Sequence, residues 1–245
     1  MNRLILVERE KISESIYRLT DRKANHILKI LKSNIGDSLK AGLWNSSIGL
    51  ARIESIDKEK REVFVSYQEE EKEIKKAGLS QLRVFSALQR PQTTKKIIQF
   101  CANCGILDLF FFPAEKSELS YLQSSIWTDE SLEEEIILGL EQGGRVLSPN
   151  IQILKNKYRI TDHLVNENRF ILNFNHNYID SFQNQISKTH PLHIVIGPES
   201  GFIEEDVKYF KNLSFKEVSV SENILRSEIA LMFFAAQLEL TFNLR

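Results

Sequence analysis

From residue 82 onward the chain alternates strand-like apolar runs with helix-like runs, and this rhythm constrains the fold more than any other feature. Four apolar runs have the length of buried strands: residues 82–88, 106–112, 170–174 and 193–196. Between the first two, Pro91 can open a helix that Gly105 would end. Strands separated by helices in this way predict an α/β fold with a mostly parallel sheet covered by helices.

The first 68 residues follow a different pattern, with short and partly alternating runs between turn-forming residues. Residues 38–43, 48–53 and 63–67 are predicted strands, and residues 57–60 would close a hairpin. Before them, residues 25–31 place apolar side chains at helical spacing. We therefore expect a small β-barrel with one short helix.

The charged run Glu69–Gly78 separates these two patterns and is typical of a domain linker. We expect two domains, residues 1–72 and residues 73–245. The formal net charge of −1 hides a difference between the two ends of the chain. Residues 1–68 carry 13 Lys and Arg against 9 Asp and Glu, a net charge of +4, whereas the remainder carries 19 against 24. A basic N-terminal module is compatible with nucleic-acid binding.

Composition excludes several classes of protein. No apolar stretch is long enough to span a membrane and the chain does not open like a signal peptide, so we expect a cytoplasmic protein without membrane association. Cys101 and Cys104 form a C-x-x-C at the end of a predicted helix, where the helix dipole does not favour a thiolate. No second pair completes a zinc site, so we expect two buried, inert thiols and no metal.

Two stretches near the C-terminus carry the chemical information. In the first, the predicted strand at 193–196 runs into Gly197-Pro198-Glu199-Ser200-Gly201 and then an acidic helix start, which read alone fits an ordinary turn. In the second, a strand at 215–220 precedes a turn and a last helix beginning at residues 224–230, with apolar residues on nearly every face. Arg226 lies at the start of that helix, either in an ion pair with Glu228 or Glu199, or as a fixed cation beside a ligand.

Together these stretches resemble the signature of the 16S rRNA uridine-N3 methyltransferases, which are SPOUT-type enzymes. The segments Lys95–Gln99, Glu141–Arg145 and Asn25–Lys32 are weaker matches to the same family. The resemblance implies a PUA-like β-barrel followed by a trefoil-knotted α/β domain. This chain departs from the family pattern at Ser200, Val220-Ser221, Ile229 and Asn103.

The resemblance implies methyl transfer from S-adenosylmethionine to N3 of a uridine in small-subunit rRNA. The family's cofactor-binding segments map to residues 172–174, 197–201 and 218–225, from which we select Leu172, Asn173, Phe174, Gly197, Pro198, Glu199, Gly201, Val218, Ser219, Val220, Ser221, Asn223, Ile224 and Leu225. Arg226 is the first candidate for catalysis, because a permanent cation can stabilise the charge that develops on the uracil carbonyls. Glu199 and Glu228 are candidates to orient Arg226 or to assist proton removal.

RNA contacts are expected mainly from a basic patch formed by several residues of the N-terminal module, although a solvated surface is the better explanation of any single lysine. The candidates are Arg22, Lys23, Lys29, Lys32, Lys40, Arg52, Gln142 and Arg145. The family resemblance and the apolar last helix imply a homodimer. Two alternatives remain open, a non-catalytic knotted protein of ribosome assembly and a related methyltransferase that acts on another RNA.

Overall fold

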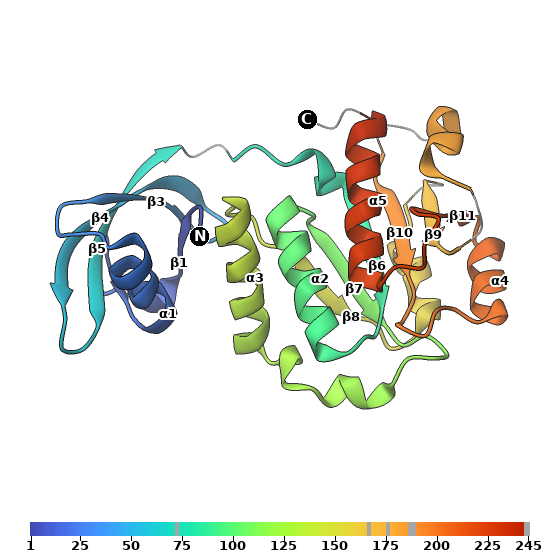
Figure 1. Cartoon of the computed structure of the whole chain (residues 1–245), viewed down its shortest axis with the longest axis horizontal. Helices are drawn as coiled ribbons and strands as arrows, with labels where there is room; N and C mark the ends of the chain where they lie inside the picture. Colours follow the sequence, from blue (N-terminus) through green and yellow to red (C-terminus); the bar gives the residue numbers. More distant parts are fainter. Residues whose placement is uncertain (72–73, 166–167, 175–176, 186–189, 243–245) are drawn as a thin grey trace. The chain divides into compact units, whose positions relative to one another are not determined.

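The computed structural model describes residues 1–245 apart from 72–73, 166–167, 175–176, 186–189 and 243–245 (Figure 1). The chain divides into two units, one formed by Met1–Lys75 with Ile137–Ser148 and the other by Lys76–Ile136 with Pro149–Arg245. The boundary expected between residues 72 and 73 lies outside the described residues, so the division into 1–72 and 73–245 stays a prediction.

The first unit is built on a five-stranded mixed sheet of order β1-β3-β4-β5-β2, in which β1 and β3 are parallel and the other pairs antiparallel. Its strands are β1 (Leu4–Leu6), β2 (Ile16–Leu19), β3 (Ser38–Leu43), β4 (Ser47–Asp57) and β5 (Glu62–Glu71). Its helical turns are η1 (Glu8–Glu10), α1 (Asp21–Asn25) and the π-helical η2 (His26–Leu31). Alternate residues such as Ile53 and Val65 pack with Ile27 into one core. The expected small β-barrel with one short helix is confirmed in the form of a half-barrel, a curled mixed sheet whose two edge strands β1 and β2 are not paired with each other.

The linker interpretation is wrong for residues 69–71, which belong to β5. Glu69 pairs with Gly49 and Glu71 pairs with Ile48 across the ladder to β4. The side chains of Glu69 and Glu70 are exposed, so the backbone hydrogen bonds of the strand form without burying these charges. A charged run can therefore continue a strand whose outer side chains reach water.

The second unit contains a six-stranded sheet of order β11-β9-β10-β6-β7-β8 in which every pair is parallel. The strands are β6 (Leu82–Ala87), β7 (Asp108–Phe112), β8 (Asn150–Ile153), β9 (Arg169–Leu172), β10 (Leu192–Ile196) and β11 (Lys216–Val218). Its helices are α2 (Pro91–Cys104), α4 (Glu204–Asn212) and α5 (Ser227–Phe242), with short turns η3 (Gly78–Gln81), η4 (Leu119–Gln123), η5 (Ser125–Trp127), η6 (Lys157–His163) and η7 (Ile179–Gln185). Helix α3 (Asp129–Gly143) begins in this unit, and its residues from Ile137 onward belong to the first unit. The predicted α/β class and parallel sheet are confirmed.

Alternating side chains divide the core of this sheet between its two faces. Phe85 and Val195 join Phe210 of α4 in one cluster, whereas Phe170 contacts Phe234 of α5 on the other face. Helices α2 and α5 lie side by side (Figure 1). Among the described residues, no helix has the length and apolar character needed to cross a membrane.

Two sequence-based expectations about the helices need correction. The last helix begins at Ser227, so Ile224 and Leu225 precede it rather than starting it. At the end of α2, burial raises the pKa of the Cys101 thiol as expected, but Cys104 is partly exposed. The chain leaves that helix through Gly105, whose φ of 73° lies in the left-handed region that favours glycine.

Candidate functional site

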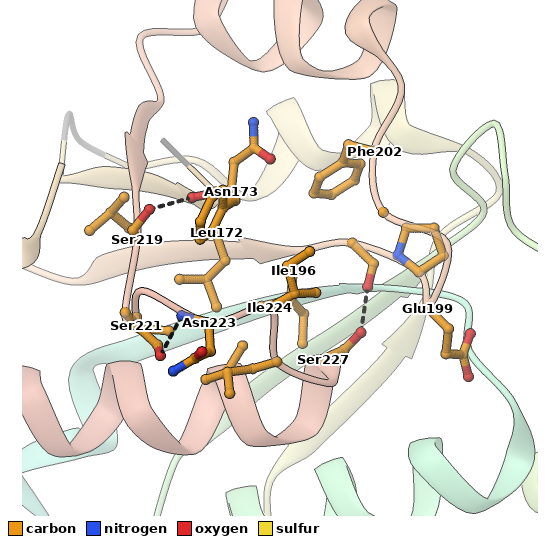
Figure 2. A pocket seen from close by; sticks show the side chains of 18 of the residues that line it. Leu172, Asn173, Ile196, Glu199, Phe202, Ser219, Ser221, Asn223, Ile224 and Ser227 are labelled. Atoms are coloured by element: carbon orange, nitrogen blue, oxygen red, sulfur yellow. Dashed lines mark hydrogen bonds between the residues drawn. The ribbon is translucent and has the colours of Figure 1, made fainter. Parts of the chain in front are cut away.

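A pocket of about 340 Å³ lies where the chain leaves three strands of the parallel sheet at their carboxyl ends (Figure 2). Its walls are the segments that follow β9, β10 and β11, together with the first turn of α5. The carboxyl edge of an open parallel sheet is the usual place for a ligand, because the loops that leave neighbouring strands converge there. The volume is in the range of small-molecule sites.

The loop after β10 forms one wall and depends on its two glycines. Gly201 has a φ of +73°, where an L side chain is strained, and its amide donates to the carbonyl of Pro198 at 2.8 Å. A Cβ on Gly197 would lie 3.2 Å from the ring of Phe202. The carbonyl of Gly197 accepts hydrogen bonds from Ser227 Oγ at 3.1 Å and Gln89 Nε2 at 3.2 Å. These contacts fix the backbone of the loop from two sides.

The loops after β9 and β11 form the opposite wall and are tied to each other. Ser219 Oγ donates to the carbonyl of Asn173 at 3.0 Å, and the amide of Asn173 donates to the carbonyl of Val218 at 3.1 Å. Ser221 Oγ accepts from the amide of Asn223 at 3.0 Å and closes a local turn. In Figure 2 the Glu199 side chain lies at the other end of the pocket from Ser219 and Ser221.

Among the described residues, the lining offers backbone groups, hydroxyls, two side-chain amides and apolar side chains, and Glu199 is its one charged member. Such a surface suits a ligand with both apolar and hydrogen-bonding parts. It lacks the cations that would favour a nucleotide pyrophosphate. Within the described part of the chain, no cluster of three or more His, Cys, Asp and Glu side chains could hold a metal ion.

Every residue selected from the sequence for cofactor binding lines this pocket. They are Leu172, Asn173, Phe174, Gly197, Pro198, Glu199, Gly201, Val218, Ser219, Val220, Ser221, Asn223, Ile224 and Leu225. Four lining residues lie outside the three predicted segments: Ile196, Phe202, Ser227 and Ala230. Each lies within five residues of a predicted segment, so the flanking sequence was the available signal. Their role toward a ligand stays a prediction.

The three candidates for catalysis occupy different environments. Glu199 is exposed, lines the pocket and accepts a hydrogen bond from the backbone amide of Arg90 at 2.8 Å. Glu228 is buried and forms an ion pair with Lys96 at 3.1 Å. Arg226 is exposed, and within the described residues its guanidinium has neither an ion pair nor a hydrogen bond. Of the two alternatives for Arg226, the ion pair with Glu228 or Glu199 is therefore not formed among the described residues, and the fixed cation beside a ligand stays a prediction.

Among the candidates for RNA contact, Lys29, Lys32, Lys40 and Arg52 are exposed on the first unit. Since Ser38 pairs with Arg52 across β3 and β4, Lys40 and Arg52 share a face of the sheet. Gln142 and Arg145 belong to the segment Ile137–Ser148 of the same unit, where Gln142 is exposed and Arg145 half-buried.

Two other basic candidates are engaged within the first unit. The Arg22 guanidinium forms an ion pair with Glu141 at 2.6 Å. Lys23 is buried and donates to Glu10 at 2.6 Å and to the carbonyl of Ile5, and burial lowers the pKa of its ammonium. Lys23 therefore holds the module together and does not present its charge to a phosphate, which corrects its assignment.

Comparison with known proteins gives independent evidence of the family and the fold of this chain. Residues 75–239 match the RNA methyltransferase domain family. The chain is 32% identical over 222 residues to ribosomal RNA small subunit methyltransferase E 1 of Borreliella burgdorferi, covering 86% of this chain and 87% of the relative. It is 27% identical to ribosomal RNA small subunit methyltransferase E of Treponema pallidum, covering 93% and 86%. The fold matches a Neisseria gonorrhoeae structure of that enzyme bound to S-adenosyl methionine, with a TM-score of 0.70, 20% identity and 98% coverage of both chains.

Proposed function

The chain belongs to the ribosomal RNA small subunit methyltransferase E family, and on that premise we propose that it methylates N3 of a uridine in small-subunit rRNA with S-adenosylmethionine as methyl donor. One observation supports this proposal most: three sequence segments selected for the cofactor converge on a single pocket at the carboxyl edge of the sheet. We place the reaction in the cytoplasm, where ribosomal subunits are found.

The pocket fits the proposed cofactor in its chemistry. Leu172, Ile196 and Leu225 offer apolar surface, while the backbone after β10 and β11 offers amides and carbonyls. Gly197 and Gly201 have no Cβ, so a ligand can approach the backbone closely at these positions. When bound, S-adenosylmethionine supplies an electrophilic methyl group on a positively charged sulfur. The chain's own task is then to bind, orient and adjust charge.

Arg226 has the properties of the group that stabilises the reacting uracil. Attack by N3 requires loss of its proton, which spreads negative charge over the two ring carbonyls. Arg226 follows the lining residue Leu225 and precedes the lining residue Ser227, and its guanidinium is free of ion pairs among the described residues. A cation that no carboxylate neutralises can act fully on that developing charge.

Glu199 is the better placed of the two carboxylates to assist proton removal. It lines the pocket and is exposed, so an extruded base can reach its carboxylate. Glu228 is buried against Lys96 and is absent from the pocket lining. We therefore assign Glu199 to the proton and Glu228 to the support of the site.

Small-subunit rRNA is the proposed substrate, and its phosphates would contact the first unit. Lys29, Lys32, Lys40 and Arg52 are exposed there, and residues 1–68 carry a net charge of +4. Phosphate contacts of this kind release counterions, so binding should weaken as salt rises. The target base must leave the RNA stack to reach a methyl donor bound in the pocket.

We further propose that the enzyme is a homodimer in which α5 packs against the second copy. Ile229, Met232, Phe233 and Leu240 form a stripe along α5, with exposed fractions between 36% and 72%. The other side of the helix packs against the sheet of its own chain through Phe234. An apolar stripe at helical spacing favours a second apolar surface, and a symmetric dimer supplies the same stripe.

The proposal is tested by mass-spectrometric mapping of rRNA from cells that lack this protein. We expect loss of one N3-methyluridine from the small-subunit rRNA and its return when the wild-type gene is restored. Loss of a methyl group from another RNA would replace the substrate but keep the chemistry. An unchanged methylation map together with impaired subunit assembly would instead support a non-catalytic assembly protein.

A further inference from the structure

Lys96 of α2 forms an ion pair with Glu228 in the first turn of α5, next to the pocket residue Ser227. Lys96 Nζ lies 3.1 Å from Glu228 Oε1, and the Glu228 side chain is 5% exposed while that of Lys96 is 53% exposed. The two residues are 132 positions apart in the chain. A buried carboxylate needs a partner for its charge, and Lys96 provides it.

Glu228 directly follows Ser227, which lines the pocket. The Ser227 hydroxyl donates to the carbonyl of Gly197 at 3.1 Å and so joins the first turn of α5 to the loop after β10. Ala230, one turn further along the same helix, also lines the pocket. Any movement of the Glu228 backbone therefore moves two pocket residues.

The two residues that precede α2 (Pro91–Cys104) also contact this loop. Gln89 Nε2 donates to the carbonyl of Gly197 at 3.2 Å, and the amide of Arg90 donates to Glu199 Oε1 at 2.8 Å. Thr94, on the first turn of α2, donates to the carbonyl of Gln89 at 3.3 Å. Residues 89–96 thus contact both the loop after β10 and the first turn of α5.

We propose that Lys96 is a positioning residue for the cofactor pocket, acting through Glu228 on Ser227 and the loop after β10. The inference rests on the proposed function, because the ligand positioned is S-adenosylmethionine. Lys96 touches neither the cofactor nor the RNA in this account. Its charge keeps the first turn of α5 in the arrangement that Ser227 needs to hold the Gly197 carbonyl.

The neighbouring lysine provides a matched control. Lys95 lies 2.5 Å from Glu135 of α3, a carboxylate whose side chain is 6% exposed. Glu135 also accepts a hydrogen bond from Gln99, and it is remote in sequence from every lining residue. Lys95 and Lys96 therefore both neutralise a buried carboxylate, but the partner of Lys96 alone adjoins a pocket residue.

The experiment is calorimetric titration of S-adenosylmethionine into the purified full-length wild type, K96M, K96R, K95M, E228Q and K96M/E228Q, with thermal unfolding of each. We expect K96M to weaken binding by roughly three- to tenfold, the size expected for a half-exposed ion pair with one buried partner. K96R should restore the affinity to within about twofold, because it restores the cation. K95M should keep the wild-type affinity, although its melting temperature should change by about as much as that of K96M. In the E228Q background, K96M should have little further effect.

Equal affinity of K96M and wild type would overturn the positioning role, as would a loss in K95M as large as that in K96M. Failure of K96R to recover binding would also overturn it. A wild-type protein that does not bind S-adenosylmethionine would instead contradict the proposed function. The two failures are therefore distinct in the same titration.

Discussion

The environment of Arg226 differs from the ion pair that its sequence neighbours suggest. Glu228 is occupied by Lys96 and Glu199 by the amide of Arg90, so both carboxylates already have partners. The guanidinium is consequently exposed next to the pocket without a neutralising group among the described residues. A sequence cannot reveal this arrangement, because Lys96 comes 132 positions before Glu228.

Arg226→Ala should reduce kcat by about 10²- to 10³-fold, the usual cost of removing a group that stabilises charge in the transition state. The affinity for S-adenosylmethionine should stay within about twofold, because Arg226 does not line the pocket. Single-turnover methylation of small subunits and calorimetry measure the two effects. Near-normal turnover would remove Arg226 from the mechanism.

In the loop after β10, the backbone conformation requires glycine at Gly201 but not at the preceding position, Ser200. Gly201 has a φ of +73°, whereas Ser200, where the family pattern has glycine, is not among the residues with positive φ. Ser221 likewise avoids positive φ and accepts the amide hydrogen of Asn223. These two departures from the family pattern therefore fit their backbones without strain.

Gly201→Ala should destabilise the fold by about 1 to 2 kcal/mol, the cost of a left-handed conformation for an L residue. Because Gly201 lines the pocket, the affinity for S-adenosylmethionine should fall as well. Ser200→Gly is the matched control and should leave both quantities almost unchanged. Chemical denaturation and calorimetry give the two values, and an equal loss in both variants would refute the conformational argument.

At the scale of elements, helix α2 and most strands of the parallel sheet were predictable, whereas three short strands were not. The pattern around Pro91 and Gly105 predicts α2, and the apolar runs predict β6, β7, β9 and β10. Strands β1, β2 and β8 contain three or four residues each, too few for a periodic signal. The charged end of β5 was mistaken for a linker because its partner β4 decides the pairing.

The site also has parts that the sequence predicts and parts that it does not. Its three loops are continuous segments, so sequence motifs locate them, and the pocket forms because β9, β10 and β11 are neighbours in the sheet. The burial of Lys23 depends on Glu10 and on the carbonyl of Ile5, which only the folded module brings together. Contacts made across the fold were therefore the part that no local pattern could supply.

Helix α5 offers a direct test of the proposed dimer. Phe233→Glu places a charge in the middle of the apolar stripe, where burial against a second copy would desolvate it. We expect the sedimentation coefficient to shift from dimer to monomer. Lys208→Glu on α4 is the control, since it makes an exposed residue acidic on a different helix. A wild type that sediments as a monomer would contradict the dimer.

At the scale of the whole molecule, a histidine inside the parallel sheet links stability to pH. His193 is completely buried, its Nδ1 lies 3.4 Å from the carbonyl of Asn168, and its Nε2 has no partner among the described residues. Burial, with a smaller contribution from Arg83 and Arg169, lowers the pKa of this imidazole from 6.5 to about 4. The folded protein therefore keeps His193 neutral where the unfolded chain binds a proton.

The free energy of unfolding should therefore carry no penalty from His193 above pH 6.5, and it should decrease as the pH falls from 6.5 to about 4. The loss attributable to this group is about 3 kcal/mol. His193→Phe should remove that part of the pH dependence, which urea denaturation at a series of pH values would detect. Identical pH profiles in the two proteins would show that His193 is not responsible.

The net charge of −1 describes neither part of the molecule. The N-terminal 68 residues are basic, and the remaining residues, which contain the pocket, carry the acidic excess. This separation supports the proposal that RNA phosphates contact one unit and that methyl transfer takes place in the other. The proposed function therefore requires both RNA binding and methyl transfer in one chain.

The most direct test of that requirement is incubation of the purified protein with unmethylated small ribosomal subunits and S-adenosylmethionine carrying an isotopically labelled methyl group. The rRNA is then digested and its nucleosides are identified by mass spectrometry. We expect label in a single N3-methyluridine with wild type, and labelling that is about 10²- to 10³-fold slower with Arg226→Ala. Label on another base or position, or no label with a wild type that binds the cofactor, would contradict the proposed function.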